Sequence, residues 1–96
     1  MSLHRRAAKR DTVEAEIVQA LQKVGARVWR LSVDSLPDLL CGIGGRFVLL
    51  ECKSTRRIRR DQARQTAAIA ELQARNLPVY VVRSVDDALQ AVGAVR

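Results

Sequence analysis

The stretch from Leu36 to Lys53, LPDLLCGIGGRFVLLECK, decides the fold, because two apolar runs meet there at the pair Gly44-Gly45. A two-residue Gly-Gly loop between apolar runs is typical of a tight β-hairpin. With the strands closed directly around that loop, Asp38 lies opposite Glu51 on the paired strand. Like charges that face each other destabilise a strand pair. The sequence therefore predicts a divalent metal ion between these two carboxylates.

Lys53 extends this candidate site, because it follows Glu51 by two residues and strand alternation places both side chains on one face, with Cys52 on the other. Carboxylate oxygens suit Mg²⁺ or Mn²⁺, which keep several waters and accept phosphate oxygens as further ligands. Two carboxylates and an amine predict phosphodiester hydrolysis, with Lys53 orienting the attacking water or stabilising transition-state charge. Alternatively, Glu51 and Lys53 form only an ion pair at an exposed strand end, which leaves Asp38 unexplained.

The rest of the pattern predicts a small α/β domain with a central mixed sheet of about four strands flanked by helices. The expected order is αβββαβ plus a short C-terminal helix. A helix over 61–75 is long enough to return the last strand parallel to the strand that ends at Lys53. We expect residues 1–11 to form a basic leader and residues 12–96 a single domain. The expected elements are a helix over 12–24, a strand over 27–33, the hairpin, the helix over 61–75, a strand over 78–83 and a helix from Ser84 to near Gly93.

Two helical positions are further candidates for the site. Glu14 lies near the apolar stripe of the first helix and can reach the edge of the core, although it could also serve only as the partner of Asp11 in a capping box. Glu16 is better interpreted as a surface charge. Gln62 begins the stripe of the second helix and needs a polar partner, either the carboxylates or a metal-bound water. Its alternative is a half-exposed helix start, and Gln65 is a weaker candidate of the same kind.

The charge of the chain predicts a polyanionic partner. Its 17 Lys and Arg residues against 10 Asp and Glu residues give a net charge of +7, and arginine pairs well with phosphate. Trp, Tyr and Phe occur once each, too few for a row of base-stacking platforms, so we expect contacts to duplex or junction backbone and recognition of shape. The alternative is a solvated face without a partner. The residues expected to contact DNA are Arg5, Arg6, Lys9, Arg10, Arg56, Arg57, Arg59, Arg60 and Arg64.

The remaining composition favours an intracellular, cytoplasmic protein with one modest core. The chain has 96 residues, 48% of them hydrophobic, and its apolar runs are too short to span a membrane. Cys41 and Cys52 lack metal or redox spacing and are interpreted as core residues. His4 precedes the first expected element, and Asp34 is a loop alternative to Asp38 that has no hairpin partner facing Glu51.

Pro37-Asp38 followed by Glu51-Cys52-Lys53 resembles the motif of the PD-(D/E)XK nuclease superfamily. With Glu14, Gln62 and the segment 81–85, the chain is similar to the VRR-NUC branch, the virus-type replication and repair nucleases, over nearly its whole length after the leader. The resemblance implies a restriction-endonuclease-like core and Mg²⁺ or Mn²⁺ held by Asp38, Glu51, Glu14 and the backbone carbonyl of Cys52. It also implies an accessory site role for Gln62. Ser35-Leu36 departs from the small residues, such as glycine, expected before Pro37-Asp38.

The same resemblance, extended to the similar archaeal junction resolvases, implies a function. It implies a homodimeric, metal-dependent DNA endonuclease that is selective for branched DNA, four-way (Holliday) junctions included. Two alternatives remain from the sequence. One is a DNA-binding module that keeps the nuclease fold without cutting, and the other is a restriction-type endonuclease that recognises a fixed sequence.

Overall fold

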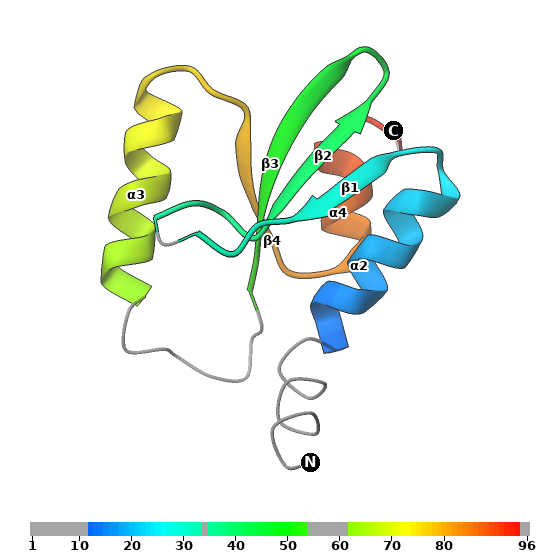
Figure 1. Cartoon of the computed structure of the whole chain (residues 1–96), viewed down its shortest axis with the longest axis horizontal. Coiled ribbons are helices and arrows are strands. Elements are labelled where there is room, and N and C mark those ends of the chain that lie inside the picture. Colours follow the sequence, from blue (N-terminus) through cyan, green and yellow to red (C-terminus); the bar gives the residue numbers. More distant parts are fainter. Residues whose placement is uncertain (1–11, 34, 54–61, 95–96) are drawn as a thin grey trace.

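The computed structural model describes residues 12–33, 35–53 and 62–94, with only the backbone described at residues 12 and 62–64. The elements follow the predicted αβββαβ order with a short final helix, so the predicted α/β fold is confirmed (Figure 1). In chain order they are α2 (Thr12–Lys23), β1 (Arg27–Arg30), β2 (Leu39–Ile43), β3 (Arg46–Cys52), α3 (Gln62–Ala74), β4 (Val79–Val82) and α4 (Val85–Ala91).

The sheet has the strand order β1-β2-β3-β4 and is mixed, as predicted: β1, β2 and β3 are antiparallel neighbours, and β4 runs parallel to β3. The hairpin register is also confirmed, since Gly42 pairs with Phe47 and Leu40 with Leu49. Gly44 and Gly45 have φ angles of 59° and 80°. Positive φ at both central residues is typical of the type I′ turn that suits a twisted hairpin.

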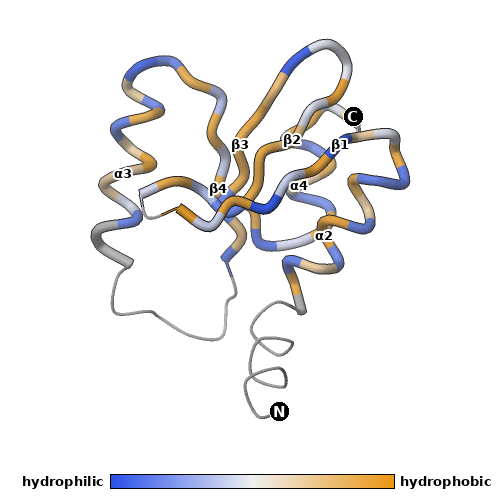
Figure 2. Tube along the Cα trace, viewed as in Figure 1, coloured by the Kyte–Doolittle hydropathy of each residue, from blue (hydrophilic) through white to orange (hydrophobic). Residues whose placement is uncertain are grey.

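The core lies between the sheet and the pair α2 and α4, which pack against each other. Figure 2 shows the hydrophobic run of the central strands at the middle of the molecule, with polar positions more frequent along the helices. The periodicity of α2 explains its burial, because Ile17 and Leu21 lie one turn apart and both are fully buried. The other buried members of this cluster are Ala26, Leu39, Cys41, Val48, Leu50, Val82, Ala88 and Val92.

Helix α3 lies on the other side of the sheet from α2 and α4 (Figure 1). It packs against β4, with Ile69 buried, and the Gln73 side-chain amide donates to the Val79 carbonyl at 2.9 Å. Strand alternation assigns the two faces, since Leu50 points to the α2 and α4 side and Glu51 to the α3 side. The sheet is therefore covered on both faces at the end where β3 finishes.

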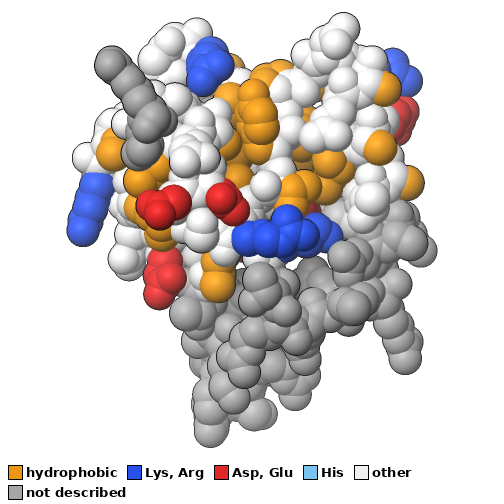
Figure 3. Space-filling view, turned by 180° about the vertical axis from the view of Figure 1, so that it is seen from behind, with side chains coloured by type: hydrophobic (Ala, Val, Ile, Leu, Met, Phe, Trp, Pro, Cys, Tyr) orange, Lys and Arg blue, Asp and Glu red, His pale blue; other side chains and the backbone are white. Residues whose placement is uncertain are grey.

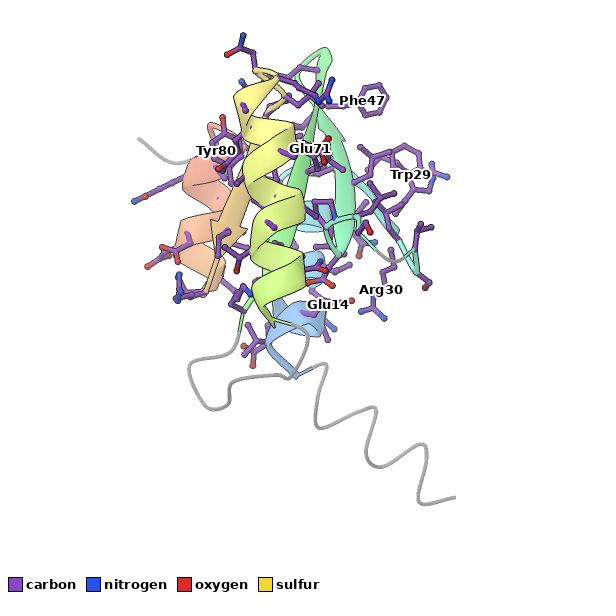
Figure 4. The ribbon with its side chains drawn as sticks, turned by 90° about the vertical axis from the view of Figure 1, so that its left-hand side faces the viewer. Glu14, Trp29, Arg30, Phe47, Glu71 and Tyr80 are labelled. Atoms are coloured by element: carbon purple, nitrogen blue, oxygen red, sulfur yellow. The ribbon has the colours of Figure 1, made fainter. Side chains whose placement is uncertain are left out.

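Two elements end earlier than expected. Strand β1 ends at Arg30 instead of Val33, and the next amide, Leu31 N–H, donates to the Asp38 carbonyl at 2.7 Å. Helix α2 ends at Lys23, one residue before the expected end. Phe47, at the hairpin end of β3 and away from the helices, is 59% exposed (Figure 4).

The turn before Asp38 has a backbone conformation that favours glycine. Ser35 has a φ angle of 74°, in the left-handed region where a Cβ atom is unfavourable. The turn is closed by the Leu36 amide, which donates to the Val33 carbonyl at 3.2 Å. The resemblance implies a small residue such as glycine at this position, and the backbone conformation of Ser35 likewise favours glycine, which has no Cβ atom.

No helix in the described ranges has the length and apolar character needed to cross a membrane.

Candidate metal centre

Three elements bring potential metal ligands together at one end of the sheet. Glu14 comes from the first turn of α2, Asp38 immediately precedes β2, and Cys52 is the last residue of β3. A carboxylate oxygen of Glu14, one of Asp38 and the Cys52 sulfur all lie within 4.8 Å of one another. Residues from three separate parts of the chain therefore share one small volume, as predicted for Glu14 and Asp38 but not for the Cys52 thiol.

Asp38 is held by both of its neighbouring strands. Its carbonyl accepts from Leu31 N–H, which continues the line of β1, and its Oδ2 accepts from Cys52 N–H at 2.9 Å. The ladder of β2 with β3 stops at Leu39 and Leu50, one pair short of the predicted pair. Beyond that point the side chain of Asp38, in place of backbone, accepts the strand amide, which fixes the carboxylate at the strand end.

Glu51 is 4% exposed and is positioned by α3. The Gln65 Nε2 atom donates to Glu51 Oε1 at 3.0 Å and to the Leu36 carbonyl at 3.0 Å. A side-chain amide has two hydrogens, so both bonds form at once. Gln65 thereby ties the turn before Asp38 to the end of β3. It was the weaker of the two glutamines considered from sequence, and the side chain of Gln62 lies outside the described residues.

Glu14 forms an ion pair that the sequence did not suggest. Its Oε2 lies 3.3 Å from Arg30 Nε, and their side chains are 18% and 51% exposed respectively. Figure 4 shows both side chains at the same end of the molecule. The alternation of β1 could have revealed the pair, because Arg30 is opposite Leu39 and so shares the face that α2 covers. Glu16 is exposed, as predicted.

The Cys52 thiol lies in a strongly anionic environment. Burial, followed by the charges of Asp38, Glu14 and Glu51, raises the pKa of the Cys52 thiol far above its ordinary value of 9.0, with Arg30 acting weakly in the opposite direction. The charges of three carboxylates therefore act on one sulfur atom. Cys41 is buried in the core, as expected, whereas Cys52 both packs against the core and faces the candidate site.

Lys53 directly follows β3 and is partly buried. Its amide donates to the Val82 carbonyl at 2.9 Å, so the parallel ladder with β4 fixes the backbone just beyond Glu51. Lys53 is therefore the first residue after the end of β3. Figure 3 shows acidic and basic side chains side by side below a central band of hydrophobic ones.

Most of the residues expected to contact DNA lie outside the described residues. The same is true of Asp34, His4 and the proposed cap Asp11. Arg64 belongs to α3 by its backbone, and its side chain lies outside as well. The residues concerned are Arg5, Arg6, Lys9, Arg10, Arg56, Arg57, Arg59 and Arg60.

The donor set suits a small divalent cation. Carboxylates at Glu14 and Asp38 supply hard oxygen atoms from two different elements, and the buried Glu51 follows on the adjacent strand. In an octahedral Mg²⁺ site, opposite ligand atoms lie about 4.2 Å apart and adjacent ones about 3 Å, so oxygen atoms within 4.8 Å of each other are near the spacing that one ion requires. A sulfur ligand favours a softer ion, whereas carboxylate oxygens are the kind of ligand that Mg²⁺ and Mn²⁺ prefer.

Comparison with protein-family models, with curated protein sequences and with solved structures found no match for this chain. The functional interpretation therefore rests on the geometry above and on the motif.

Proposed function

We propose that this chain is a metal-dependent DNA endonuclease of the PD-(D/E)XK type, similar to the VRR-NUC branch. The observation that carries the proposal is the convergence of Glu14 and Asp38 within 4.8 Å beside the end of β3, where Glu51 is buried and Lys53 follows. A divalent cation bound here would interact with all of these acidic groups.

In this proposal, Asp38, Glu51, Glu14 and the Cys52 carbonyl hold Mg²⁺ or Mn²⁺. When bound, the cation supplies a Lewis acid and lowers the pKa of a coordinated water. Lys53 orients the attacking water and stabilises the charge that develops on the phosphate. Gln65 keeps Glu51 and the turn before Asp38 in register through its two hydrogen bonds.

The substrate class follows from charge and from the resemblance. A net charge of +7 favours a polyanion, and the basic run from Arg56 to Arg60 follows Lys53 closely in the chain. We propose branched DNA, four-way junctions included, as the substrate. We further propose a homodimer with two active sites that acts in the cytoplasm.

The decisive experiment is cleavage of linear, flapped, splayed and four-way DNA of matched sequence with Mn²⁺, Mg²⁺ or a chelator. Metal-dependent cutting of branched DNA should be lost in Asp38→Asn and in Lys53→Ala, while DNA binding is retained. The amide introduced by Asp38→Asn keeps an oxygen that can accept from Cys52 N–H, so loss of cutting would not reflect loss of the fold. Cleavage of linear duplex at one fixed sequence would contradict the structure-selective part of the proposal.

A matched pair on α2 tests the metal site without relying on activity. A ligand that binds only the folded state raises the melting temperature. Mn²⁺ should therefore raise the melting temperature of the native chain and of Glu16→Gln, whose side chain is exposed. The rise should be much smaller in Glu14→Gln and Asp38→Asn. An equal rise in all four proteins would remove these carboxylates from the metal site.

One observation favours a second candidate, a DNA-binding module that keeps this fold without cutting. The Arg30 guanidinium already compensates the charge of Glu14 at 3.3 Å, as a purely structural acidic cluster would require. In that case Asp38→Asn leaves function intact, and the native chain binds DNA tightly without cutting it under any metal.

A further inference from the structure

Two of the three aromatic side chains of this protein meet near the turn of the hairpin. Trp29 is 40% exposed and Phe47 is 59% exposed, and their ring centroids lie 6.2 Å apart with the planes tilted by 45°. They come from β1 and β3, on either side of β2. Figure 4 shows both rings projecting from the same side of the sheet.

Gly42, on the strand between them, makes room for the Phe47 ring and lies beside both rings. A Cβ atom at this position would lie 3.2 Å from Cε1 of Phe47, which is tight, and 3.8 Å from Cζ3 of Trp29, which is an ordinary contact. The glycine hydrogen therefore lets the Phe47 ring approach the β2 backbone. The pair is therefore an assembled surface on the sheet and not two separate exposed side chains.

The aromatic pair lies on the same face of the sheet as Glu51. Trp29 is opposite Leu40 and Gly42 is opposite Phe47, and directly paired residues share a face. From Phe47 the alternation of β3 returns to that face at Glu51, four residues on, or about 13 Å along the strand. The rings therefore lie about one strand length from the end of β3, beside which the candidate metal centre lies.

The charges around the pair decide what kind of partner fits. The Arg27 guanidinium carbon lies 5.5 Å from the centroid of the Trp29 ring. A second copy of this chain that packed on this surface would bring two Arg27 side chains together in a protein of net charge +7. A nucleic acid supplies both a base for the rings and a phosphate for Arg27.

We propose that Trp29 and Phe47 form a stacking platform for an unpaired base of the nucleic acid substrate, with Arg27 holding an adjoining phosphate. The platform deepens the proposed function, on which it rests, because it selects DNA with unpaired nucleotides next to the cleaved bond. Three aromatics in the sequence predicted no such platform, but the fold gathers two of them in one place.

Tryptophan fluorescence provides the test, since Trp29 is the only tryptophan of the chain. The full-length protein, in chelator to prevent cutting, is titrated with a short oligothymidylate and with a blunt duplex. We expect the oligothymidylate to quench the fluorescence of Trp29. Phe47→Leu, which keeps an apolar side chain but removes the ring, should weaken binding of the oligothymidylate by about tenfold and leave binding of the blunt duplex unchanged. Leu77→Ala, an exposed apolar change outside the platform, should alter neither.

Three results that do not depend on cleavage would overturn the platform. The first is an oligothymidylate that leaves the fluorescence of Trp29 unquenched. The second is binding of the oligothymidylate by Phe47→Leu as tightly as by the native chain. The third is a fall in sedimentation mass in Phe47→Leu, which would assign the pair to an interface between two copies.

Failure of the nuclease proposal gives a different pattern. If no metal supports cutting but quenching and the selective loss in Phe47→Leu are found, the platform stands on a binding module. If branched DNA is cut equally well by Phe47→Leu and by the native chain, the nuclease stands and the platform does not.

Discussion

At the residue scale, Asp38 contributes both its backbone and its side chain to the end of the sheet that carries the candidate site. Its carbonyl accepts from Leu31 N–H and its carboxylate from Cys52 N–H, so both bonds orient the same residue. Cys52 in turn experiences the charge of three carboxylates. The raised pKa of this thiol keeps it protonated in the folded state, so the stability of the fold depends on whether that proton is bound.

We predict that Cys52 makes the protein less stable at alkaline pH. The pKa of its thiol is raised above 9.0 in the folded state, first by burial and then by Asp38. As the pH rises past 9.0, the unfolded chain loses this proton while the folded chain keeps it, so the free energy of unfolding falls. Urea denaturation at several pH values should give a steeper fall above pH 9.0 in the native chain than in Cys52→Ala. Equal slopes in the two proteins would contradict this prediction.

At the element scale, α3 is fastened to the sheet by polar contacts as well as by Ile69. Gln65 bonds the end of β3 and the turn before Asp38, and Gln73 bonds the Val79 carbonyl at the start of β4. The two glutamines lie on the same helix, but only Gln65 contacts the candidate site. Substitutions at these two glutamines therefore distinguish the packing of α3 from the positioning of Glu51.

We predict that Gln65→Leu lowers the free energy of unfolding by about 1–3 kcal/mol, because Glu51 and the Leu36 carbonyl lose a donor in a partly buried place. The stabilisation by Mn²⁺ should also decrease, since Glu51 is no longer held. Gln73→Leu is the control, with a loss of about 1 kcal/mol and an unchanged response to Mn²⁺. Urea denaturation with and without Mn²⁺ measures both effects. If the two variants responded alike to Mn²⁺, Gln65 would be a packing residue only.

At the scale of the whole molecule, positive charge is distributed unevenly along the chain. The described ranges contain eight Lys and Arg residues and seven Asp and Glu residues, whereas the remaining residues contain nine and three. Most of the excess charge therefore lies in residues 1–11 and 54–61. The second of these segments directly follows Lys53, which links the candidate site in sequence to one of the two main sources of positive charge.

We predict that DNA binding weakens steeply with salt and that the segment 54–61 carries much of this dependence. Each phosphate contact contributes about 0.9 to the slope of log affinity against log salt. Replacing Arg56, Arg57, Arg59 and Arg60 by alanine should therefore make the slope shallower. Arg75→Ala should leave it unchanged, because that guanidinium pairs with Glu71 at 3.2 Å on the far end of α3. Anisotropy of labelled DNA in chelator provides the measurement, and an identical slope in both variants would rule out this segment.

The sequence by itself determined the order of the elements and the register of the hairpin. Both are local properties, since the Gly44-Gly45 turn fixes which residues pair and apolar periodicity fixes which face of an element is buried. The same patterns placed Glu14 at the core edge and Glu16 in solvent. They failed at an element end, where β1 stops three residues early.

Only the tertiary structure decided which side chains meet. Periodicity assigns a residue to a face but contains no distance between faces of different elements. The packing of α2 and α3 on the sheet brought Cys52 and Arg30 to Glu14 and brought Gln65 to Glu51. The joining of Trp29 and Phe47 across Gly42 likewise depends on three strands at once. Contacts between residues far apart in sequence are set by how whole elements pack, and the local pattern of any one element does not contain that information.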